Sequence, residues 1–478
     1  MRNRIALAIV VAVSGTAVAK EPAGKIPLTT SSDEARELYL KARDLNEKLK
    51  ATDAHKMFEQ AVAKDASFAM GYLGLAQSSG TTKEFFEALT KAVANAPKAS
   101  AAEQLVIKSV EAGAKGDPAH QKEYLTKLVA QFPTDERAQA QLGIYYTGTQ
   151  DYPNAIKAFE AAIKINPTFS PPYNQVGYAY RFVDRFQDAE KAFKKYIELI
   201  PDDPNPYDSM GELLMKMGRF DDSIKSYTKA LSIDPNFVAS LVGIGNDQMF
   251  MGKYDDARKS FAKLLSIARN DGEKRQAEIW TVVSYTHEAA WDKALAELDK
   301  LGAISTKAND NGQHAFDLNF AGNINLEAGR WDAAAKAFND QMTVMDKADV
   351  PAENKTTAHR NHLYDEARVA LGKSDLATAK AKAKDYATQV AAKNIPFEVR
   401  QSHELDGMVA MAAKDWKAAV AELTKANQRD PRVLYLTAVA YQGAGDAAKA
   451  KAMAAKAADF NELAFNLGFV RGKAKALK

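Results

Sequence analysis

Two consecutive stretches of sequence decide the fold: residues 136–169, ERAQAQLGIYYTGTQDYPNAIKAFEAAIKINPTF, and residues 170–203, SPPYNQVGYAYRFVDRFQDAEKAFKKYIELIPDD. Each stretch is 34 residues long, and the two agree in the positions of a glycine, a proline and an alanine–phenylalanine pair. The register continues on both sides, with glycines at Gly143, Gly177, Gly211 and Gly245. Prolines keep the same step at Pro133, Pro167, Pro201 and Pro235. A period of this length indicates an array of small repeated units.

Each recurring residue has a mechanical reason for its place. The glycine follows an apolar residue and lets a second helix approach closely. The alanine and the ring four positions later form one apolar stripe of that second helix, and they recur as Ala155/Phe159, Ala189/Phe193, Ser223/Tyr227 and Ala257/Phe261. The proline cannot continue a helix and marks the end of the unit. We therefore expect each unit to be two antiparallel helices.

This pattern resembles the tetratricopeptide repeat, because several positions of the 34-residue period recur together. The resemblance implies an all-α solenoid, a right-handed superhelix of about twelve helix-turn-helix units. Extending the register gives unit starts near Ala35, Ala69, Ala102, Glu136, Ser170, Pro204, Val238, Arg275, Ala315, Ala358, Arg400 and Pro431. The units between 136 and 272 are the most regular. Beyond about residue 270 the loops lengthen, with polar segments at 309–312 and 351–355.

The first residues have the pattern of a secretory signal peptide. Arg2 and Arg4 precede an apolar run from Ile5 to Val13, and Ala17-Val18-Ala19 fits the small-residue cleavage motif. The uncharged stretch is too short to span a bilayer as a helix. We therefore expect cleavage after Ala19 and a periplasmic or secreted protein.

The register divides the chain into five regions. They are a signal peptide (1–19), a flexible leader (20–34), a regular repeat array (35–272), a divergent array with longer loops (273–460) and a C-terminal capping helix with a basic tail (461–478). The capping helix is expected from about residue 461 to residue 474, because a solenoid needs an element that covers its exposed end.

Composition excludes several classes of function. The 64 Lys and Arg against 61 Asp and Glu give a net charge of +3, without the clustered basic surface that a nucleic-acid partner requires. The chain has no cysteine, so disulfides, thiolate metal ligands, thiol nucleophiles and a lipid-modified cysteine are excluded.

Two patterns resemble catalytic motifs, but each lacks a required part of its motif. The Ser226-x-x-Lys229 pair resembles a β-lactamase nucleophile motif, but it recurs 34 residues later at Ser260-x-x-Lys263 without the accompanying Lys-Thr-Gly. His287-Glu288 begins like a zinc-protease helix, but Trp291 stands where the second histidine must lie. We therefore predict no catalytic residue and no cofactor.

Tryptophan and histidine side chains occur at several positions where a ligand or metal site has to be considered. Trp291, Trp331 and Trp416 share one position in their units and are predicted to pack at the start of the second helix. His359, His362 and Glu366 share one helix face, which makes them weak candidates for a metal site, although ordinary polar surface is the favoured interpretation. No metal is predicted.

The family resemblance implies that a partner lies along the concave face made by the first helices. The residues projected onto that face are Arg137, Asn174, Tyr178, Arg181, Asn205, Asp208, Glu212, Asn246, Met249, Asn319 and Asn323. Asparagines recur among them, and a side-chain amide offers both donors and an acceptor to an extended peptide. Ala140 and Ile144 stand where chaperone-binding relatives carry a charged clamp, so an acidic-tail ligand is not expected.

The sequence therefore favours a non-catalytic scaffold of the cell envelope that binds a protein or extended peptide, with its best-formed groove between Glu136 and Gly272. Two alternatives stay open. One is an enzyme with a site in the divergent region up to about residue 430, or a subunit of a catalytic complex. The other is a receptor for a small ligand such as a glycan fragment, which an exposed Trp280 would favour. The oligomeric state is left open.

Overall fold

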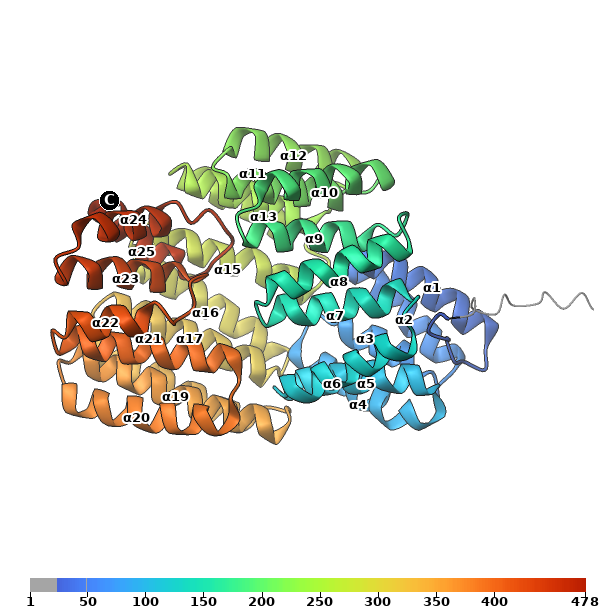
Figure 1. Ribbon diagram of the computed structural model, residues 1–478, viewed down its shortest axis with the longest axis horizontal. Helices are drawn as coiled ribbons and strands as arrows, with labels where there is room; N and C mark the ends of the chain where they lie inside the picture. Colours follow the sequence, from blue (N-terminus) through green and yellow to red (C-terminus); the bar gives the residue numbers. More distant parts are fainter. Residues whose placement is uncertain (1–23, 49) are drawn as a thin grey trace, which may run out of the picture.

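The computed structural model describes residues 24–48 and 50–478, which form twenty-five α-helices, one short 3-10 helix (Ala96–Lys98) and no strand (Figure 1). The expected all-α solenoid and its twelve units are confirmed. The first six helix pairs comprise α1 (Asp33–Glu47), α2 (Ala51–Lys64), α3 (Ala69–Gln77), α4 (Thr82–Asn95), α5 (Ala101–Ala114), α6 (Pro118–Gln131), α7 (Glu136–Gly148), α8 (Tyr152–Ile165), α9 (Pro171–Phe182), α10 (Phe186–Leu199), α11 (Asn205–Lys216) and α12 (Phe220–Ile233).

The remaining six pairs and a final helix complete the array. They are α13 (Val238–Phe250), α14 (Tyr254–Ile267), α15 (Asp271–His287), α16 (Trp291–Lys307), α17 (Asn311–Glu327), α18 (Trp331–Met345), α19 (Ala352–Gly372), α20 (Leu376–Lys393), α21 (Pro396–Ala412), α22 (Trp416–Leu423), α23 (Pro431–Gly443), α24 (Ala447–Ala458) and α25 (Leu467–Leu477). No helix among the described residues is long and apolar enough to cross a membrane. The predicted signal peptide lies outside the described part of the chain.

The period follows from one contact that each regular unit repeats. A Cβ atom built at Gly177 would lie 2.5 Å from Cε1 of Phe193, and one at Gly245 would lie 2.2 Å from Cε1 of Phe261. Both rings are fully buried. Because a real Cβ essentially never comes so close, only glycine allows the second helix to seat its ring against the first.

The turn between the two helices of a unit contains a residue with a positive φ, which also recurs with the period. Gln150, Asp184, Gly218 and Gly252 follow one another at 34-residue intervals, and all have a positive φ between 58° and 80°. This left-handed conformation reverses the chain after the first helix. Glycine adopts it without strain, which explains its presence at two of the four turns.

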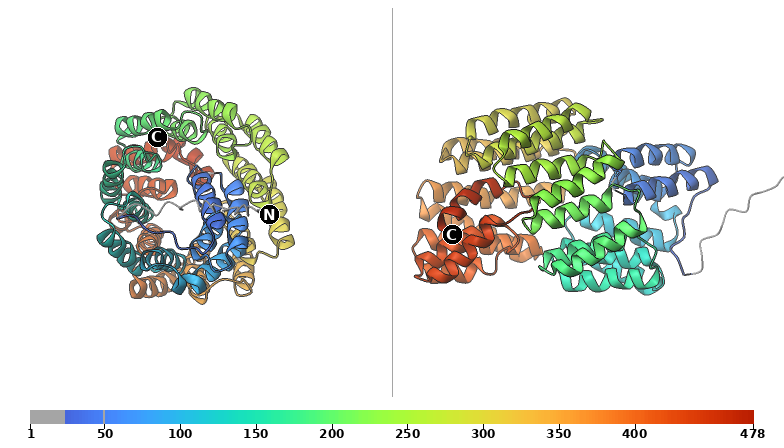
Figure 2. Two further views of the ribbon diagram at one scale, coloured as in Figure 1. Left: turned by 90° about the vertical axis from the view of Figure 1, so that its right-hand side faces the viewer. Right: turned by 90° about the horizontal axis from the view of Figure 1, so that it is seen from above.

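The superhelix turns through one full revolution and then touches its own beginning (Figure 2). Thr52 donates a hydrogen bond of 3.0 Å to Glu273, and the amide of Thr82 donates one of 3.0 Å to Asp310. In a third contact between distant parts of the chain, Arg429 donates a hydrogen bond of 3.1 Å to the carbonyl of Phe182. These pairs are 221, 228 and 247 residues apart, or about seven repeats of 34 residues.

The C-terminal end of the chain bridges two parts of the superhelix. Helix α25 begins at Leu467, six residues later than expected, and it packs against α15 and α23 as well as α24. Its Phe469 lies 6.2 Å from both Trp291 and Phe320, measured between ring centroids. The helix therefore joins the eighth unit to the twelfth, in addition to covering the end of the stack.

Glu462, in the segment before α25, fixes this bridge by ion pairs. It pairs with Lys216 at 2.7 Å and with Arg429, which come from the sixth unit and from the loop before α23. Burial opposes its ionisation, but the positive charges of Arg181, Arg429 and Lys216 outweigh burial and lower the pKa of Glu462 to about 2. A buried carboxylate thus links three cations from distant parts of the sequence.

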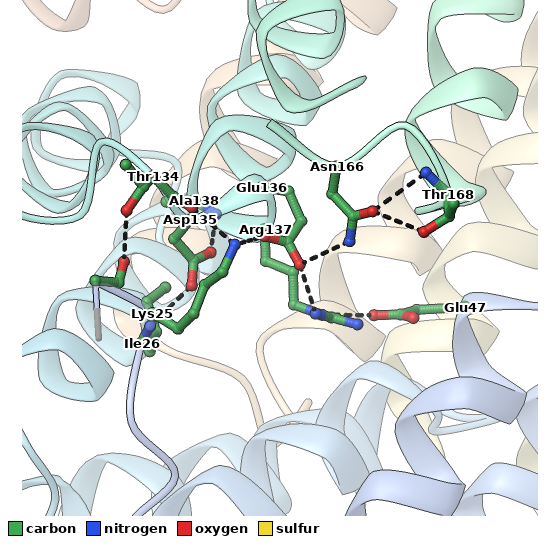
Figure 3. Close-up of polar contacts among 11 residues, drawn as sticks. Lys25, Ile26, Glu47, Thr134, Asp135, Glu136, Arg137, Ala138, Asn166 and Thr168 are labelled. Carbon is green, nitrogen blue, oxygen red and sulfur yellow. Dashed lines mark hydrogen bonds and ion pairs between the residues drawn. The ribbon is translucent and has the colours of Figure 1, made fainter. Parts of the chain in front are cut away.

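Residues 24–32 correct the expectation of a flexible leader. They lie against the starts of the first four units, where the amide of Ile26 donates a hydrogen bond of 2.8 Å to Asp135 (Figure 3). Lys25 also donates a bond of 2.7 Å to the carbonyl of Thr134. The carboxylates that hold this segment are separated from it by 34 to 111 residues, so no local pattern reveals the contact.

Candidate partner-binding surface

The central part of the predicted groove is closed by its own packing. Of the eleven residues projected onto the concave face, six are buried: Asn174, Arg181, Asn205, Asp208, Asn246 and Met249. Two of them accept hydrogen bonds from the next unit: Asn174 accepts one of 2.7 Å from Ser209, and Asp208 accepts one of 2.7 Å from Ser240. The expectation of an open groove between 136 and 272 is therefore corrected. The first helices of neighbouring units pack too closely to leave these side chains accessible.

Three other predicted residues of this region, Arg137, Tyr178 and Glu212, are partly exposed but are also engaged within the chain. Arg181 donates a bond of 3.1 Å to Glu212, and Tyr178 donates one of 3.4 Å to Ser209. Arg137 donates a bond of 3.3 Å to Glu47 of the first unit (Figure 3). These contacts hold neighbouring or distant units together.

Buried acids accompany this packing, and one of them, Asp247, was not among the residues predicted from the sequence. Asp247 of α13 has no exposed surface, and neither of its carboxylate oxygens has a hydrogen-bond partner among the described residues. Burial, reinforced by the charge of Asp221, raises the pKa of Asp247 to about 8. Burial and the charge of Glu212 also hold the pKa of Asp208 well above its usual range. The carboxyl group of Asp247 is therefore largely protonated at neutral pH.

An open pocket lies instead in the C-terminal half of the superhelix. It has a volume of about 490 Å³, and its walls come mainly from the first helices of units nine to twelve, with Thr82 and Phe86 of α4 and Gln341 and Met345 of α18. Two phenylalanine side chains of the lining remain exposed in the folded chain, Phe316 by 41% and Phe397 by 54%. Exposed aromatic surface of this kind marks binding sites more often than structural faces. We call this feature the C-terminal pocket.

The floor of the C-terminal pocket is a balanced set of charges. Arg432 donates hydrogen bonds of 2.9 Å to Glu404 and 2.7 Å to the hydroxyl of Tyr364. Asp365 lies 3.5 Å from Arg368, and burial outweighs the two nearby arginines to raise its pKa to about 6. The buried Arg368 and the mostly buried Arg432 thus face two buried carboxyl groups, those of Asp365 and Glu404. The floor attracts neither a strongly acidic nor a strongly basic ligand.

Side-chain amides line the wall above this floor. Asn319 donates a bond of 3.2 Å to Asp365, and Asn323 accepts one of 2.7 Å from Arg368. Tyr386 donates 2.8 Å to the carbonyl oxygen of Gln401, which leaves the amide nitrogen of that residue for a ligand. Asn319 and Asn323 are therefore the two residues of the predicted groove that line an open site. Phe397 and Gln401 were not predicted: Phe397 precedes the expected unit start at Arg400, and Gln401 lies in the divergent part of the array.

The metal candidates do not converge. His359 contacts Asp346 at 2.8 Å, and Glu366 pairs with Lys382 at 2.7 Å. Nδ1 of His362 is buried without a hydrogen-bond partner. In residues 24–48 and 50–478 no group of three or more His, Asp or Glu side chains is arranged to hold a metal ion. The three residues behave as separate polar side chains.

The tryptophans lie in packing positions. Trp291, Trp331 and Trp416 are each the first residue of a second helix and are partly buried. Trp280 is only 6% exposed and lies 5.0 Å from the ring of Phe465. The exposed Trp280 that would favour a glycan receptor is therefore not found.

Comparison with known proteins agrees with this architecture. Profiles described as tetratricopeptide repeat match residues 136–169, 170–203 and 209–237. These matches show that the chain contains tetratricopeptide repeats, and the twelve helix pairs of the structure continue the same helix-turn-helix unit on both sides of them, as in a protein-interaction scaffold. No curated protein matches the chain.

Solved structures that resemble the chain do so over one part of it. A crystal structure of MamA shares 25% identity with a TM-score of 0.29, covering 35% of this chain and 96% of that one. MamA from Desulfovibrio magneticus RS-1 shares 19% identity with a TM-score of 0.30, covering 35% and 94%. A tetratricopeptide repeat protein from Parabacteroides merdae ATCC 43184 shares 16% with a TM-score of 0.38, covering 55% and 98%. At these scores the similarities carry nothing about function.

Proposed function

We propose that the protein is a non-catalytic scaffold of the cell envelope that binds an extended, largely uncharged segment of a partner protein in the C-terminal pocket. The observation that carries the proposal is the pairing of two exposed phenylalanines with a row of amide side chains on one inner wall. An extended peptide presents apolar side chains to such rings, and its backbone groups to such amides.

The balanced floor supports the same choice of ligand. Arg368 and Arg432 are already matched by Asp365 and Glu404, so a charged segment would gain no free counter-charge there. A neutral segment needs no counter-charge in order to bind there. The envelope location rests on the basic, apolar and small-residue zones of residues 1–19.

Replacing Phe316 and Phe397 together with serine is expected to weaken peptide binding at least tenfold, because both exposed anchors are lost. The probe is a peptide selected on the wild-type chain from a library of random, displayed segments, and its affinity is measured by fluorescence polarisation. The helical circular-dichroism spectrum should be unchanged, since neither side chain is buried.

Ile144 and Leu265 provide a matched control, because they are exposed by 53% and 38% but lie far from the C-terminal pocket in sequence, on α7 and α14. Their double replacement with serine should leave the affinity unchanged. Equal loss of binding in both double variants would show a nonspecific apolar attraction. Undiminished binding in the phenylalanine variant would place the site elsewhere.

A further inference from the structure

Residues 25–31 cross the starts of the first four units as an extended segment, which we call the strap. Three of its backbone amides donate to carboxylates of different units: Ile26 to Asp135 at 2.8 Å, Thr29 to Glu103 at 2.7 Å and Ser31 to Asp65 at 2.8 Å. A backbone amide is present in every residue except proline, so this mode of recognition depends on spacing more than on side-chain identity.

The three carboxylates are part of the rigid array. Asp65 ends α2, Glu103 lies in the first turn of α5, and Asp135 caps α7. They are exposed by only 7%, 0% and 4%. A buried carboxylate needs hydrogen-bond donors, and here much of the requirement is met by the strap. Although burial opposes it, hydrogen bonds from Thr30, Ser31 and Ser67 lower the pKa of Asp65.

The strap also contributes side-chain contacts of two kinds. Ile26 and Leu28 are two residues apart and so share a face of the extended segment, and Leu28 is buried to 7% exposure in the core of the first units. At the other end, Lys25 forms an ion pair with Glu136 (Figure 3). The surface thus offers one acidic contact for a lysine, apolar contacts at alternate positions, and three carboxylates for backbone amides.

We propose that this surface, formed by Asp65, Glu103, Asp135 and Glu136 and called the ledge, is a second peptide-binding site. Its partner is an extended segment of another protein that carries a lysine followed by apolar residues at alternate positions. The strap is the intramolecular occupant of the ledge. Because the strap is tethered next to its site, it competes at a high effective concentration, and a partner must displace it.

The geometry of the strap explains why displacement is feasible. The chain enters α1 only at Asp33, and the strap is held by hydrogen bonds, the Lys25–Glu136 ion pair and two apolar side chains. All of these contacts can be reproduced by another extended chain with the same spacing. The ledge lies at the starts of units one to four, whereas the C-terminal pocket is lined mainly by units nine to twelve. The two proposals can therefore fail independently.

The test uses a fluorescent peptide with the sequence of residues 24–31, GKIPLTTS, and the full chain in two forms. In the released form, Ile26→Asp and Leu28→Asp weaken the strap. We expect the peptide to bind the released form at least tenfold more tightly than the wild-type chain, because its site is vacated. Adding Asp135→Asn and Glu103→Gln to the released form should abolish this binding.

The controls separate the alternatives. Phe316→Ser with Phe397→Ser should not alter binding of the strap peptide, because these residues belong to the C-terminal pocket. Equal affinity of the wild-type and released forms would overturn the proposal, as would no binding to a released form of unchanged helicity. A doubled mass of the wild-type chain in light scattering, lost in the released form, would assign the ledge to strap exchange between copies and would also overturn it.

A second measurement avoids any dependence on the folding of the released form. The wild-type chain is mixed with excess peptide, and hydrogen exchange of residues 25–31 is followed by mass spectrometry. Displacement predicts faster exchange of the strap, and a control peptide with the same residues in scrambled order must not cause it. Unchanged exchange of the strap at saturating peptide would contradict the proposal.

Discussion

Replacing Phe193 with alanine is expected to lower the free energy of unfolding by about 3–5 kcal/mol, the usual cost of truncating a fully buried phenylalanine. The ring has no exposed surface, shares one buried cluster with Phe159 of the fourth unit and lies 5.4 Å from the ring of Tyr178, measured between centroids. A solenoid distributes stability among neighbouring units, so the loss should appear as a shifted urea-unfolding curve of the central array. Circular dichroism measures it, with Ile144→Ala, an exposed site, as the control.

The cause of this loss can be checked by coupling it to Gly177. Alone, Gly177→Ala should destabilise the protein by about 1–3 kcal/mol, because its new Cβ would lie 2.5 Å from the Phe193 ring. In the Phe193→Ala background the same change should cost almost nothing, since the ring is gone. Equal cost in both backgrounds would show that the glycine is needed for another reason.

Replacing Asp247 with asparagine is expected to stabilise the protein at alkaline pH by several kcal/mol. The pKa of Asp247 rises from 3.8 to about 8 on folding, chiefly through burial, and each pKa unit corresponds to about 1.4 kcal/mol. The folded state therefore holds the proton more tightly than the unfolded state. Stability from this group is complete below about pH 4, falls as the pH rises, and reaches its lowest level above about pH 8.

The measurement is the difference in unfolding free energy between Asp247→Asn and the wild type across that pH range. It should grow from near zero at about pH 4 and level off above about pH 8. Asp256→Asn serves as the control, because that side chain is half exposed beside Lys259 and should give a small, flat difference. A flat difference for Asp247→Asn as well would mean that water reaches its carboxylate.

The repeated unit could be predicted from sequence because its cause is local. The glycine and the ring that touch, such as Gly177 and Phe193, lie sixteen residues apart and recur with every unit. The closure of the superhelix could not be predicted in the same way. Pairs such as Thr52 and Glu273 meet only after about seven small rotations between units have accumulated.

The candidate site, too, could be predicted from the sequence only in part. The period correctly placed Asn319 and Asn323 on the inner face, and the structure finds both in an open pocket. It placed Asn205 and Asn246 there by the same rule, yet both are fully buried. Exposure depends on how closely neighbouring first helices pack, and that spacing is set by side chains from two units at once.

The most direct test of the central claim is a hydrogen-exchange footprint of the display-selected peptide on the full chain. Binding in the C-terminal pocket predicts slower exchange in α17, α19 and α21, centred on the segments that contain Phe316, Asn323 and Gln401, with little change in α7 to α14. Protection confined to second helices that do not line the pocket, such as α20 and α22, would contradict the account.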